Sequence, residues 1–345
     1  MSELSKPKVL IVGAGSMGLI AGYHLSLSGA SITFLVRPHR VEALSRPQIL
    51  YSYEQNSLKE FTGYRIITSP SEIASTAYDY IVITLDAVAL KNEVGQSLVK
   101  AIGEATRGTD TKILLGSISF NLLSWFLETS GLDASQATNG LLGTHAYSPK
   151  AVTLPIHAPT DPELLAKADL AYTDAIGQGF MLDDSSPTVA AAFMELYNKS
   201  GVSKCITIPA ADLAVAANPI FAIFAACYLL DWPSFASIDA EGEVWKLATK
   251  AVKEIQGLSV HGMAGQKALL TTTEEGLAAN LIGFEKVMLP LDLPAFNKYH
   301  HGGKVNAQDR ELLRACVEYG EKEGHEMLGL KELIRRVEAK DVAVK

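Results

Sequence analysis

The sequence predicts an N-terminal α/β domain built on a doubly wound parallel sheet, residues 1–185, followed by an all-α C-terminal domain, residues 186–345. Three observations support this organisation. The chain has 345 residues, which is long for a single domain. Short apolar runs alternate with helical patterns in its first half, as in proteins with parallel sheets. From about Ser186 onward, apolar residues recur mainly at helical spacing.

The composition points to a folded protein that acts on a small molecule. Hydrophobic residues make up 48% of the chain and charged residues 20%, which is typical of a protein with a sizeable core. The net charge of -8 argues against binding to nucleic acid or to an anionic membrane, because both attract basic surfaces. A homodimer is compatible with the sequence, which does not fix the oligomeric state.

The cysteines give no sign of a disulfide framework. Cys205, Cys227 and Cys316 are widely separated, odd in number and not at the spacing of metal ligands. We therefore expect buried thiols in a reducing compartment, and no metal. The polar start of the chain, MSELSKPK, is unlike a secretory signal, so we expect a cytoplasmic protein.

One stretch, LAVAANPIFAIFAACYLL at 213–230, resembles a membrane span in its apolar composition. It follows Asp212 and contains Asn218 and Pro219 near its middle. A helix buried in protein on all sides has the same composition. We interpret the stretch as a core helix with a kink near Pro219, and expect no insertion into a membrane.

The most informative segment is KVLIVGAGSMGLIAGYHLSLSGASITFLVR at 8–37. Its first five residues predict a strand buried on both faces. Three glycines at GxGxxG spacing follow, then a helical pattern and a second apolar run at 31–36. This order of strand, turn, helix and strand is typical of the dinucleotide-binding unit of a Rossmann fold.

Each glycine of the motif has a predicted role. Gly13 allows the tight turn, Gly15 lets the backbone approach a pyrophosphate, and Gly18 lets the helix pack close to the strand. The pyrophosphate would accept hydrogen bonds at the N-terminus of the helix, which includes Ser16 and Met17. The alternative is a glycine-rich turn that binds no nucleotide.

The end of the second strand selects the cofactor. An acidic residue there would bind the ribose 2′-hydroxyl of NAD, but this chain has VRPHR, with Arg37 at the strand tip and Arg40 shortly after. A guanidinium can hold a 2′-phosphate through two parallel hydrogen bonds, which favours NADP(H). The alternative is a pair of solvated surface arginines.

Further elements continue the α/β pattern. The predicted strands lie at 78–85, 111–117, 139–148 and 151–159. An amphipathic helix at 87–105 separates the first two. The loops after these two strands would face the nicotinamide end of the cofactor. They make Leu85 and Asp86 candidate cofactor residues and Asn121 a candidate substrate residue.

The second half of the chain is mostly helical, apart from a short strand at 204–209. The predicted helices lie at 188–201, 212–230, 243–256, 274–289 and 306–324. A Rossmann domain followed by a helical domain, with a cleft between them, is a common plan among dehydrogenases.

The order of motifs resembles the ketopantoate reductase family. KVLIVGAGSMG, LVR, IVITLDA, LLGTHA, the NP of the apolar helix and GG…QD…L…EYGEKEG follow one another as they do in that family, over most of the chain. The resemblance implies an enzyme that reduces the 2-keto group of ketopantoate with NADPH. It also implies a cofactor site that includes Gly13, Gly15, Gly18 and Arg37.

The catalytic positions that the resemblance implies do not match this sequence. The family lysine that donates a proton to the carbonyl falls on Ala210, and one family asparagine falls on Ala214. The asparagine before the proline is kept as Asn218. A lysine that usually follows the third strand is Asp86 here, and the family's NGxG loop reads ISFN, which ends at Asn121.

NKYHHGGKV at 297–305 offers a replacement proton donor. Matched to the family segment that contacts substrate, it puts Phe296 in the place of a glutamate and His301 in that of an asparagine. Histidine titrates near neutral pH and can give or take a proton. We therefore expect His301, and second His300, to act as general acid on the cleft wall, with Lys304 as an electrostatic aid. The alternative is a solvated turn or a capping role.

Two functions are compatible with these observations. The first is an NADP(H)-dependent oxidoreductase that acts on a carbonyl or imine. Its substrate would be mostly hydrophobic and not ketopantoate, since no Lys or Arg occurs between Lys204 and Lys246. The second is a protein that binds NADP(H) without redox turnover, as a non-redox isomerase, a cyclase or a sensor.

Overall fold

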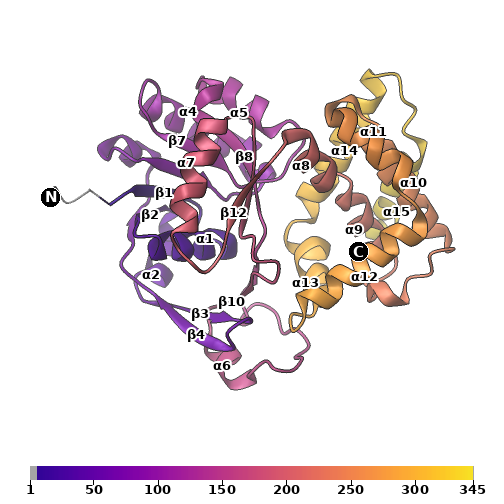
Figure 1. The fold of residues 1–345 in the computed structure, drawn as a ribbon, viewed down its shortest axis with the longest axis horizontal. Helices are drawn as coiled ribbons and strands as arrows, with labels where there is room; N and C mark the ends of the chain where they lie inside the picture. Colours follow the sequence, from indigo (N-terminus) through magenta and orange to yellow (C-terminus); the bar gives the residue numbers. More distant parts are fainter. Residues whose placement is uncertain (1–5, 345) are drawn as a thin grey trace. The chain divides into compact units, whose positions relative to one another are not determined.

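The computed structural model describes residues 6–344 and contains two compact units. In Figure 1 the first is coloured from indigo through magenta to rose, and the second mostly from orange to yellow. Unit 1 comprises residues 1–153 and 158–208, and unit 2 comprises residues 154–157 and 209–345. The predicted fold classes are confirmed, because unit 1 is α/β and unit 2 is helical. The units divide at 208/209 rather than at the predicted 185/186, since the helix and strand after residue 185 pack and pair within unit 1.

Eight strands form the main sheet of unit 1. In order across the sheet they are β12 (Cys205–Ile208), β11 (Phe180–Asp183), β8 (Ala137–Leu142), β7 (Lys112–Leu115), β6 (Tyr80–Ile83), β1 (Lys8–Val12), β2 (Ser31–Leu35) and β5 (Arg65–Ile67). The six strands from β8 to β5 are parallel. β11 pairs antiparallel with β8 and parallel with β12, so the sheet is mixed. The chain leaves β1 toward β2 and later returns to its other side as β6, which makes the end of β1 a switch point.

Helices cover both faces of this sheet. Unit 1 contains α1 (Ser16–Leu27), α2 (Val41–Leu44), α3 (Ala87–Lys91), α4 (Glu93–Thr106), α5 (Leu122–Ser130), α6 (Pro162–Lys167) and α7 (Pro187–Asn198). Val9 and Ile11 of β1 belong to an apolar core with α1 and α7, whereas Leu10 and Val12 belong to a second core with α4 and α5. A strand buried on both faces has a continuous apolar sequence, which is why KVLIV was recognisable.

The predicted helix 87–105 is two helices, α3 and α4, separated at Asn92. Asn92 has an extended backbone, and its side chain accepts a hydrogen bond from the Gly95 amide at 2.9 Å, which caps α4. A Cβ on Gly95 would lie 2.1 Å from the carbonyl oxygen of Ala89, so the two helices meet at close backbone contact.

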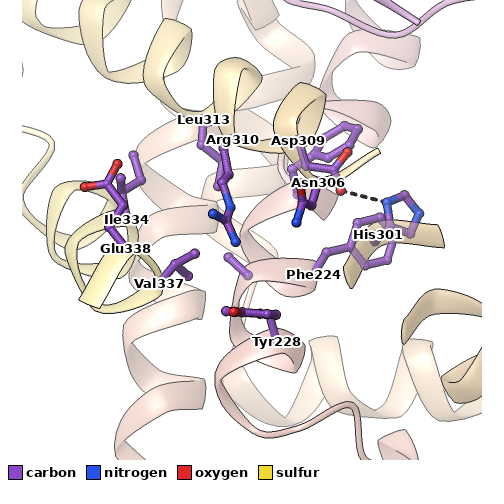
Figure 2. A pocket seen from close by; sticks show the side chains of 12 residues that line it. Phe224, Tyr228, His301, Asn306, Asp309, Arg310, Leu313, Ile334, Val337 and Glu338 are labelled. Carbon is purple, nitrogen blue, oxygen red and sulfur yellow. Dashed lines mark hydrogen bonds and ion pairs between the residues drawn. The ribbon is translucent and has the colours of Figure 1, made fainter. Parts of the chain in front are cut away.

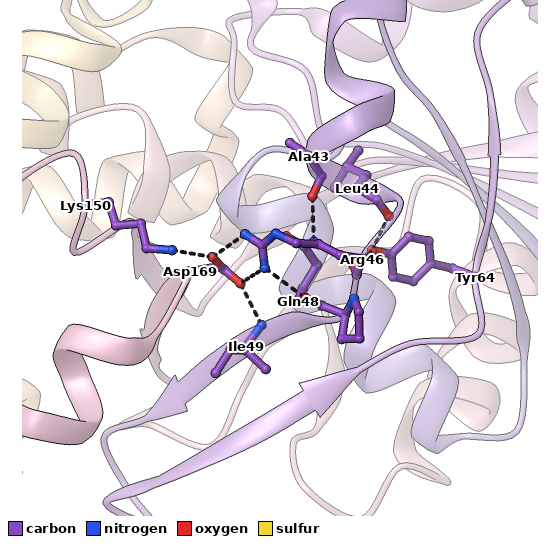
Figure 3. A network of polar contacts seen from close by, with 9 residues as sticks. Ala43, Leu44, Arg46, Gln48, Ile49, Tyr64, Lys150 and Asp169 are labelled. Carbon is purple, nitrogen blue, oxygen red and sulfur yellow. Dashed lines mark hydrogen bonds and ion pairs between the residues drawn. The ribbon is translucent and has the colours of Figure 1, made fainter.

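A second sheet of unit 1 has four strands, in the order β4 (Ser57–Phe61), β3 (Gln48–Ser52), β10 (Leu170–Thr173) and β9 (His145–Tyr147). Asp169 joins its central strands (Figure 3). It accepts two hydrogen bonds from Arg46, at 2.6 and 2.8 Å, and one each from Lys150 and the Ile49 amide. The Arg46 guanidinium holds the pKa of Asp169 well below its usual range. This ion pair fixes the starts of β3 and β10 side by side.

The predicted strand 139–148 is wrong in extent. Its residues belong to β8 in the large sheet and β9 in the small one, with a turn between them. A Cβ on Gly143, in that turn, would lie 2.0 Å from the carbonyl oxygen of Gln178. Glycine therefore allows the chain to leave one sheet for the other at this point.

The predicted strand 151–159 is also wrong. Only an isolated bridge between Ile156 and Leu291 forms there, within unit 2. Pro155 and Pro159 have no N–H to donate, so this segment cannot continue a ladder of hydrogen bonds.

Unit 2 is built from helices α8 (Ala210–Ala217), α9 (Ile220–Leu229), α10 (Glu243–Gln256), α11 (Gly262–Thr271), α12 (Glu274–Met288), α13 (Leu293–Tyr299), α14 (Asn306–Lys322) and α15 (Leu328–Val344). α9 packs against α10 and α15 and buries Phe221, Ile223 and Cys227. The kink predicted near Pro219 is confirmed, because α8 ends just before this residue and α9 begins just after it.

The stretch Ala210–Leu229 is long and apolar enough to cross a membrane by length and composition alone, and half of its apolar window is buried in the structure. The buried residues are mainly those of α9, as expected for a core helix, whereas Leu213 is the one buried residue of α8. The three cysteines are free and buried, as predicted, and burial raises the pKa of each thiol to about 12. Across residues 6–344, no group of three or more His, Cys, Asp or Glu side chains is arranged to hold a metal ion.

Candidate functional site

The loop between β1 and α1 is shaped by its glycines. Gly13 has a φ of +101°, which L side chains rarely adopt, and its amide donates to the Leu35 carbonyl at 3.0 Å. A Cβ on Gly18 would lie 2.1 Å from the carbonyl oxygen of Gly13. Only glycine therefore allows α1 to start this close to the end of β1.

Gly15 differs from the other two glycines because it faces open space. A Cβ built on it meets nothing within 4 Å, and the residue is exposed. It precedes Ser16 and Met17 in the first turn of α1, which no side chain caps in the described part of the chain. Backbone amides at such an end attract anions, so the loop fits a pyrophosphate.

Two arginines lie at the carboxyl end of β2. Arg37 and Arg40 are both exposed, and a short 3₁₀ turn connects them. Arg40 Nη2 donates to the carbonyl oxygen of Ala14 at 3.2 Å, which holds this guanidinium beside the glycine loop. The pair thus presents positive charge where a dinucleotide would carry its ribose phosphate.

The loops after β6 and β7 meet at the same edge of the sheet. The Leu85 side chain packs beside Gly13, and its carbonyl accepts a hydrogen bond from Ser117. Asp86 accepts a hydrogen bond from the Ala89 amide at 2.8 Å, so its carboxylate caps α3. Asn121 is exposed, with a left-handed backbone at the start of α5.

Sequence reasoning missed one cation at this edge. Lys91 Nζ donates to Ser119 Oγ at 3.0 Å and joins the loop after β6 to the loop after β7. Its position at the end of the short helix α3, which follows β6, was the available signal.

The candidate substrate residues of unit 2 lie on and after α8. Ala210 and Ala214 are half-buried in this helix and carry no titratable group. Asn218, at its end, is buried, and its Nδ2 donates to Nε2 of the buried His261 at 3.0 Å. Burial lowers the pKa of His261.

The histidine pair lies in a single π-helical turn, His300–Lys304, between α13 and α14. The amide of Val305 donates to the His300 carbonyl at 2.9 Å, which is the i to i+5 bond of a π-helix. A Cβ on Gly302 would lie 2.9 Å from Trp232 Nε1, so glycine permits this packing. π-Helical turns recur at functional sites, although they do not by themselves define one.

Both imidazoles pack on aromatic rings, whereas Lys304 is exposed. His301 stacks on Phe224 with ring centroids 3.7 Å apart, and His300 stacks on the buried Phe296 at 5.3 Å. The alternative of a solvated turn is therefore wrong for His301, whose side chain is 15% exposed. The predicted position of the pair on a cleft wall stays a prediction.

His301 has a buried acidic partner. Its Nδ1 lies 2.8 Å from Oδ2 of Asp309, in the first turn of α14. Burial lowers the pKa of His301 to about 3 and raises the pKa of Asp309 to about 8. Both shifts favour the uncharged forms at neutral pH, and the predicted role of His301 as general acid stays a prediction.

His301 and Asp309 line a pocket among α9, α14 and α15 (Figure 2). Its wall is largely apolar, with Phe224, Leu313 and Val337 among the lining side chains. Arg310 points into it toward the Tyr228 ring, 5.4 Å from the ring centroid, and binds both carboxylate oxygens of Asp341. The pocket therefore joins an apolar wall to one acid–imidazole pair.

The glycine loop, the open space at Gly15 and the switch point beside β1 give unit 1 the features of a Rossmann-class domain. Residues 9–107 match the family model described as ketopantoate reductase PanE/ApbA. The family resemblance is therefore confirmed over the segment that carries the glycine loop and both arginines.

Solved structures share the fold over nearly the whole chain. The 2-dehydropantoate 2-reductase of Geobacter metallireducens GS-15 is 18% identical, with a TM-score of 0.64 over 96% of this chain and 99% of that one. A D-mandelate dehydrogenase solved with NADH and anilino(oxo)acetate is 15% identical, with a TM-score of 0.64 over 97% and 99%. A dimeric ketopantoate reductase of Staphylococcus aureus is 13% identical, with a TM-score of 0.59 over 96% and 98%. No curated protein sequence matches the chain significantly.

Proposed function

We propose that the protein is an NADP(H)-dependent oxidoreductase that acts on a carbonyl or imine of a mostly hydrophobic substrate other than ketopantoate. The observation that carries this proposal is the glycine loop with two arginines beside it. Gly15 leaves room for a pyrophosphate, and Arg40 is held at the loop by its bond to Ala14. The family match over residues 9–107 and the NADH-bound D-mandelate dehydrogenase support a nicotinamide cofactor.

The residues that would hold the cofactor follow from this geometry. The first-turn amides of α1, including Ser16 and Met17, would bind the pyrophosphate. Arg37 and Arg40 would bind the 2′-phosphate, where they select NADP(H) over NAD(H). When bound, the cofactor supplies or accepts a hydride.

The substrate preference rests on unit 2. Ala210 and Ala214 offer no charge to a substrate carboxylate, and no Lys or Arg occurs between Lys204 and Lys246. Reduction of a carbonyl still requires a group that protonates or stabilises the developing alkoxide. We assign that role to His301, with His300 as the second choice.

We also propose that the protein is cytoplasmic and forms a homodimer. The homodimer is proposed by analogy with the dimeric Staphylococcus aureus enzyme.

Two measurements test the proposal. Titration of the purified protein with NADPH and NADH gives the affinity for each, and we expect tighter binding of NADPH. The loss of NADPH absorbance is then followed against a panel of aldehydes, ketones and imines with apolar groups. Turnover of one of them supports the oxidoreductase. Tight binding of NADPH with no turnover across the panel would favour the non-redox alternative instead.

A further inference from the structure

His301 and Asp309 form a buried hydrogen-bonded pair that the resemblance does not assign. Their side chains are 15% and 8% exposed, and the ring of His301 stacks on Phe224. Within residues 6–344, Oδ1 of Asp309 is buried and accepts no hydrogen bond. An ionised carboxylate would leave this oxygen charged and unsolvated, which is costly.

We propose that Asp309 is held as an uncharged carboxylic acid and supplies a proton to His301 while His301 protonates the substrate. This inference rests on the proposed function and deepens it, because it names the source of the proton. Asp309 is then a positioning and proton-supplying residue, and His301 is the group that touches the substrate.

The charged groups around the pair leave this state intact. Arg310, next to Asp309 on α14, acts to lower the pKa of Asp309, but burial raises it more, and the Arg310 guanidinium binds both oxygens of Asp341 on α15. Glu338 of α15 is paired with Arg314 of α14 at 2.6 Å.

Two further titratable side chains lie near the pair. Tyr228 of α9 donates its hydroxyl hydrogen to Asp341 at 2.7 Å. The His300 ring lies 4.8 Å from the His301 ring, nearly perpendicular to it. Burial raises the pKa of Asp309 to about 8, which agrees with an acid form at neutral pH.

Before the proton transfer, Asp309 and His301 are both uncharged, so the pair buries no net charge. With Asp309 donating to Nδ1, the neutral imidazole carries its hydrogen on Nε2. The bond to Asp309 uses Nδ1, which leaves Nε2 as the ring nitrogen that would serve the substrate. A bound reduced nicotinamide would supply the hydride for the carbonyl carbon. With that addition the Nε2–H bond of His301 breaks and an O–H bond forms on the substrate. Nδ1 then takes the proton of Asp309, which leaves an aspartate and a neutral imidazole.

The protonation state is tested first, without cofactor. Protein with ¹⁵N-labelled imidazoles is titrated by NMR, with His301→Gln used to assign the signal. We expect a neutral ring protonated at Nε2 at neutral pH, which changes to the Nδ1-protonated form above about pH 8 as the pair loses its proton. Asp309→Asn should abolish this change, and Glu338→Gln, in the same pocket, should keep it. An imidazolium that titrates near pH 6.5 would overturn the inference.

Transfer to the substrate is tested by the pH dependence of turnover. For wild type, the rate of carbonyl reduction should fall above about pH 8, because the acid form is lost. Asp309→Asn should lower kcat by about 10²–10⁴ and should remove the fall in rate at high pH, with the affinity for NADPH unchanged. An Asp309→Asn enzyme whose rate still falls above about pH 8 would overturn the proposal that Asp309 supplies the proton. Absence of turnover in wild type would refute the proposed function, and the NMR titration would still decide the state of the pair.

Discussion

Asn218 Nδ2 donates a hydrogen bond to Nε2 of His261 over 3.0 Å, and both side chains are buried within unit 2. Asn218, which caps the end of α8, is the polar side chain there that the family resemblance retains. Its amide hydrogen is directed at a core histidine, so this residue ties the end of α8 to the segment before α11. Its role is therefore structural at least in part.

Replacing Asn218 with Ala should destabilise the protein by about 1–3 kcal/mol, because Nε2 of His261 loses its donor in a buried place. The free energy of unfolding from chemical denaturation measures this loss. The affinity for NADPH should stay unchanged. A variant with wild-type stability but impaired turnover would show that Asn218 serves the substrate instead.

Arg37→Ala should weaken the binding of NADPH by about 1–3 kcal/mol and leave NADH almost unchanged, since only NADPH carries the 2′-phosphate. Arg65→Ala provides the matched control, because Arg65 is also exposed and lies on the neighbouring strand β5. Fluorescence titration with both cofactors measures the difference. Equal losses for NADPH and NADH would contradict the assignment of Arg37 to the phosphate.

Gly15 and Gly18 should respond differently to a side chain. Gly15→Val should fold normally, since a Cβ there meets nothing within 4 Å, but it should lose cofactor binding because the side chain fills the space left for the pyrophosphate. Gly18→Ala should lower the melting temperature, because its Cβ would lie 2.1 Å from the carbonyl oxygen of Gly13. Thermal unfolding and cofactor titration of both variants separate the two effects. If Gly15→Val bound NADPH like wild type, the loop would not hold the pyrophosphate.

His24 should make the stability of the protein depend on pH. It is buried in α1, its Nδ1 lies 2.7 Å from the Tyr197 hydroxyl, and burial lowers its pKa to about 4. The neutral ring is favoured in the folded state, so its contribution is full above the unfolded value of about 6.5 and is lost as pH falls toward 4. The size of this contribution is about 3 kcal/mol.

The measurement compares the unfolding free energies of wild type and His24→Gln between pH 7 and 4. Asp174, whose pKa burial raises to about 6, titrates in the same range, but it is present in both proteins and cancels in the difference. Parallel curves for the two proteins would show that His24 is not the source of the pH dependence.

The parts of the fold that the sequence predicts are those set by local patterns. KVLIV is apolar throughout because both faces of β1 are buried, and the kink in the apolar helix follows from Pro219. The four-stranded sheet was not predicted, since β3 and β10 pair across more than a hundred residues and are aligned by Arg46 and Asp169. Nothing in the sequence around Arg46 or around Asp169 indicates that the two side chains form an ion pair.

The candidate sites divide in the same way. The glycine loop could be predicted because each of its glycines meets a local backbone requirement. The neighbours of His301 in the sequence were enough to select it as a candidate, but they did not indicate its protonation state. Asp309 lies 8 residues later, in the first turn of α14, and the π-helical turn lies between the two residues. In a regular helix, two residues eight positions apart lie only roughly on the same side. The hydrogen bond could therefore not be inferred from the spacing.

Ketopantoate should be a poor substrate. The resemblance places a proton-donating lysine at Ala210, and a positioned acid contributes about 10²–10⁴ to the rate of such a reaction. Moreover, α8 offers no cation for the carboxylate of ketopantoate, because its only charged residue is Asp212.

The measurement is the NADPH-dependent reduction of ketopantoate, compared under the same conditions with an apolar ketone that the panel identifies. We expect a much larger kcat/KM for the apolar ketone, and an Asp212→Asn variant should not restore ketopantoate turnover, since it removes a negative charge without adding an acid. Efficient reduction of ketopantoate by wild type would show that another residue replaces the lysine, and would refute the proposed preference for an uncharged substrate.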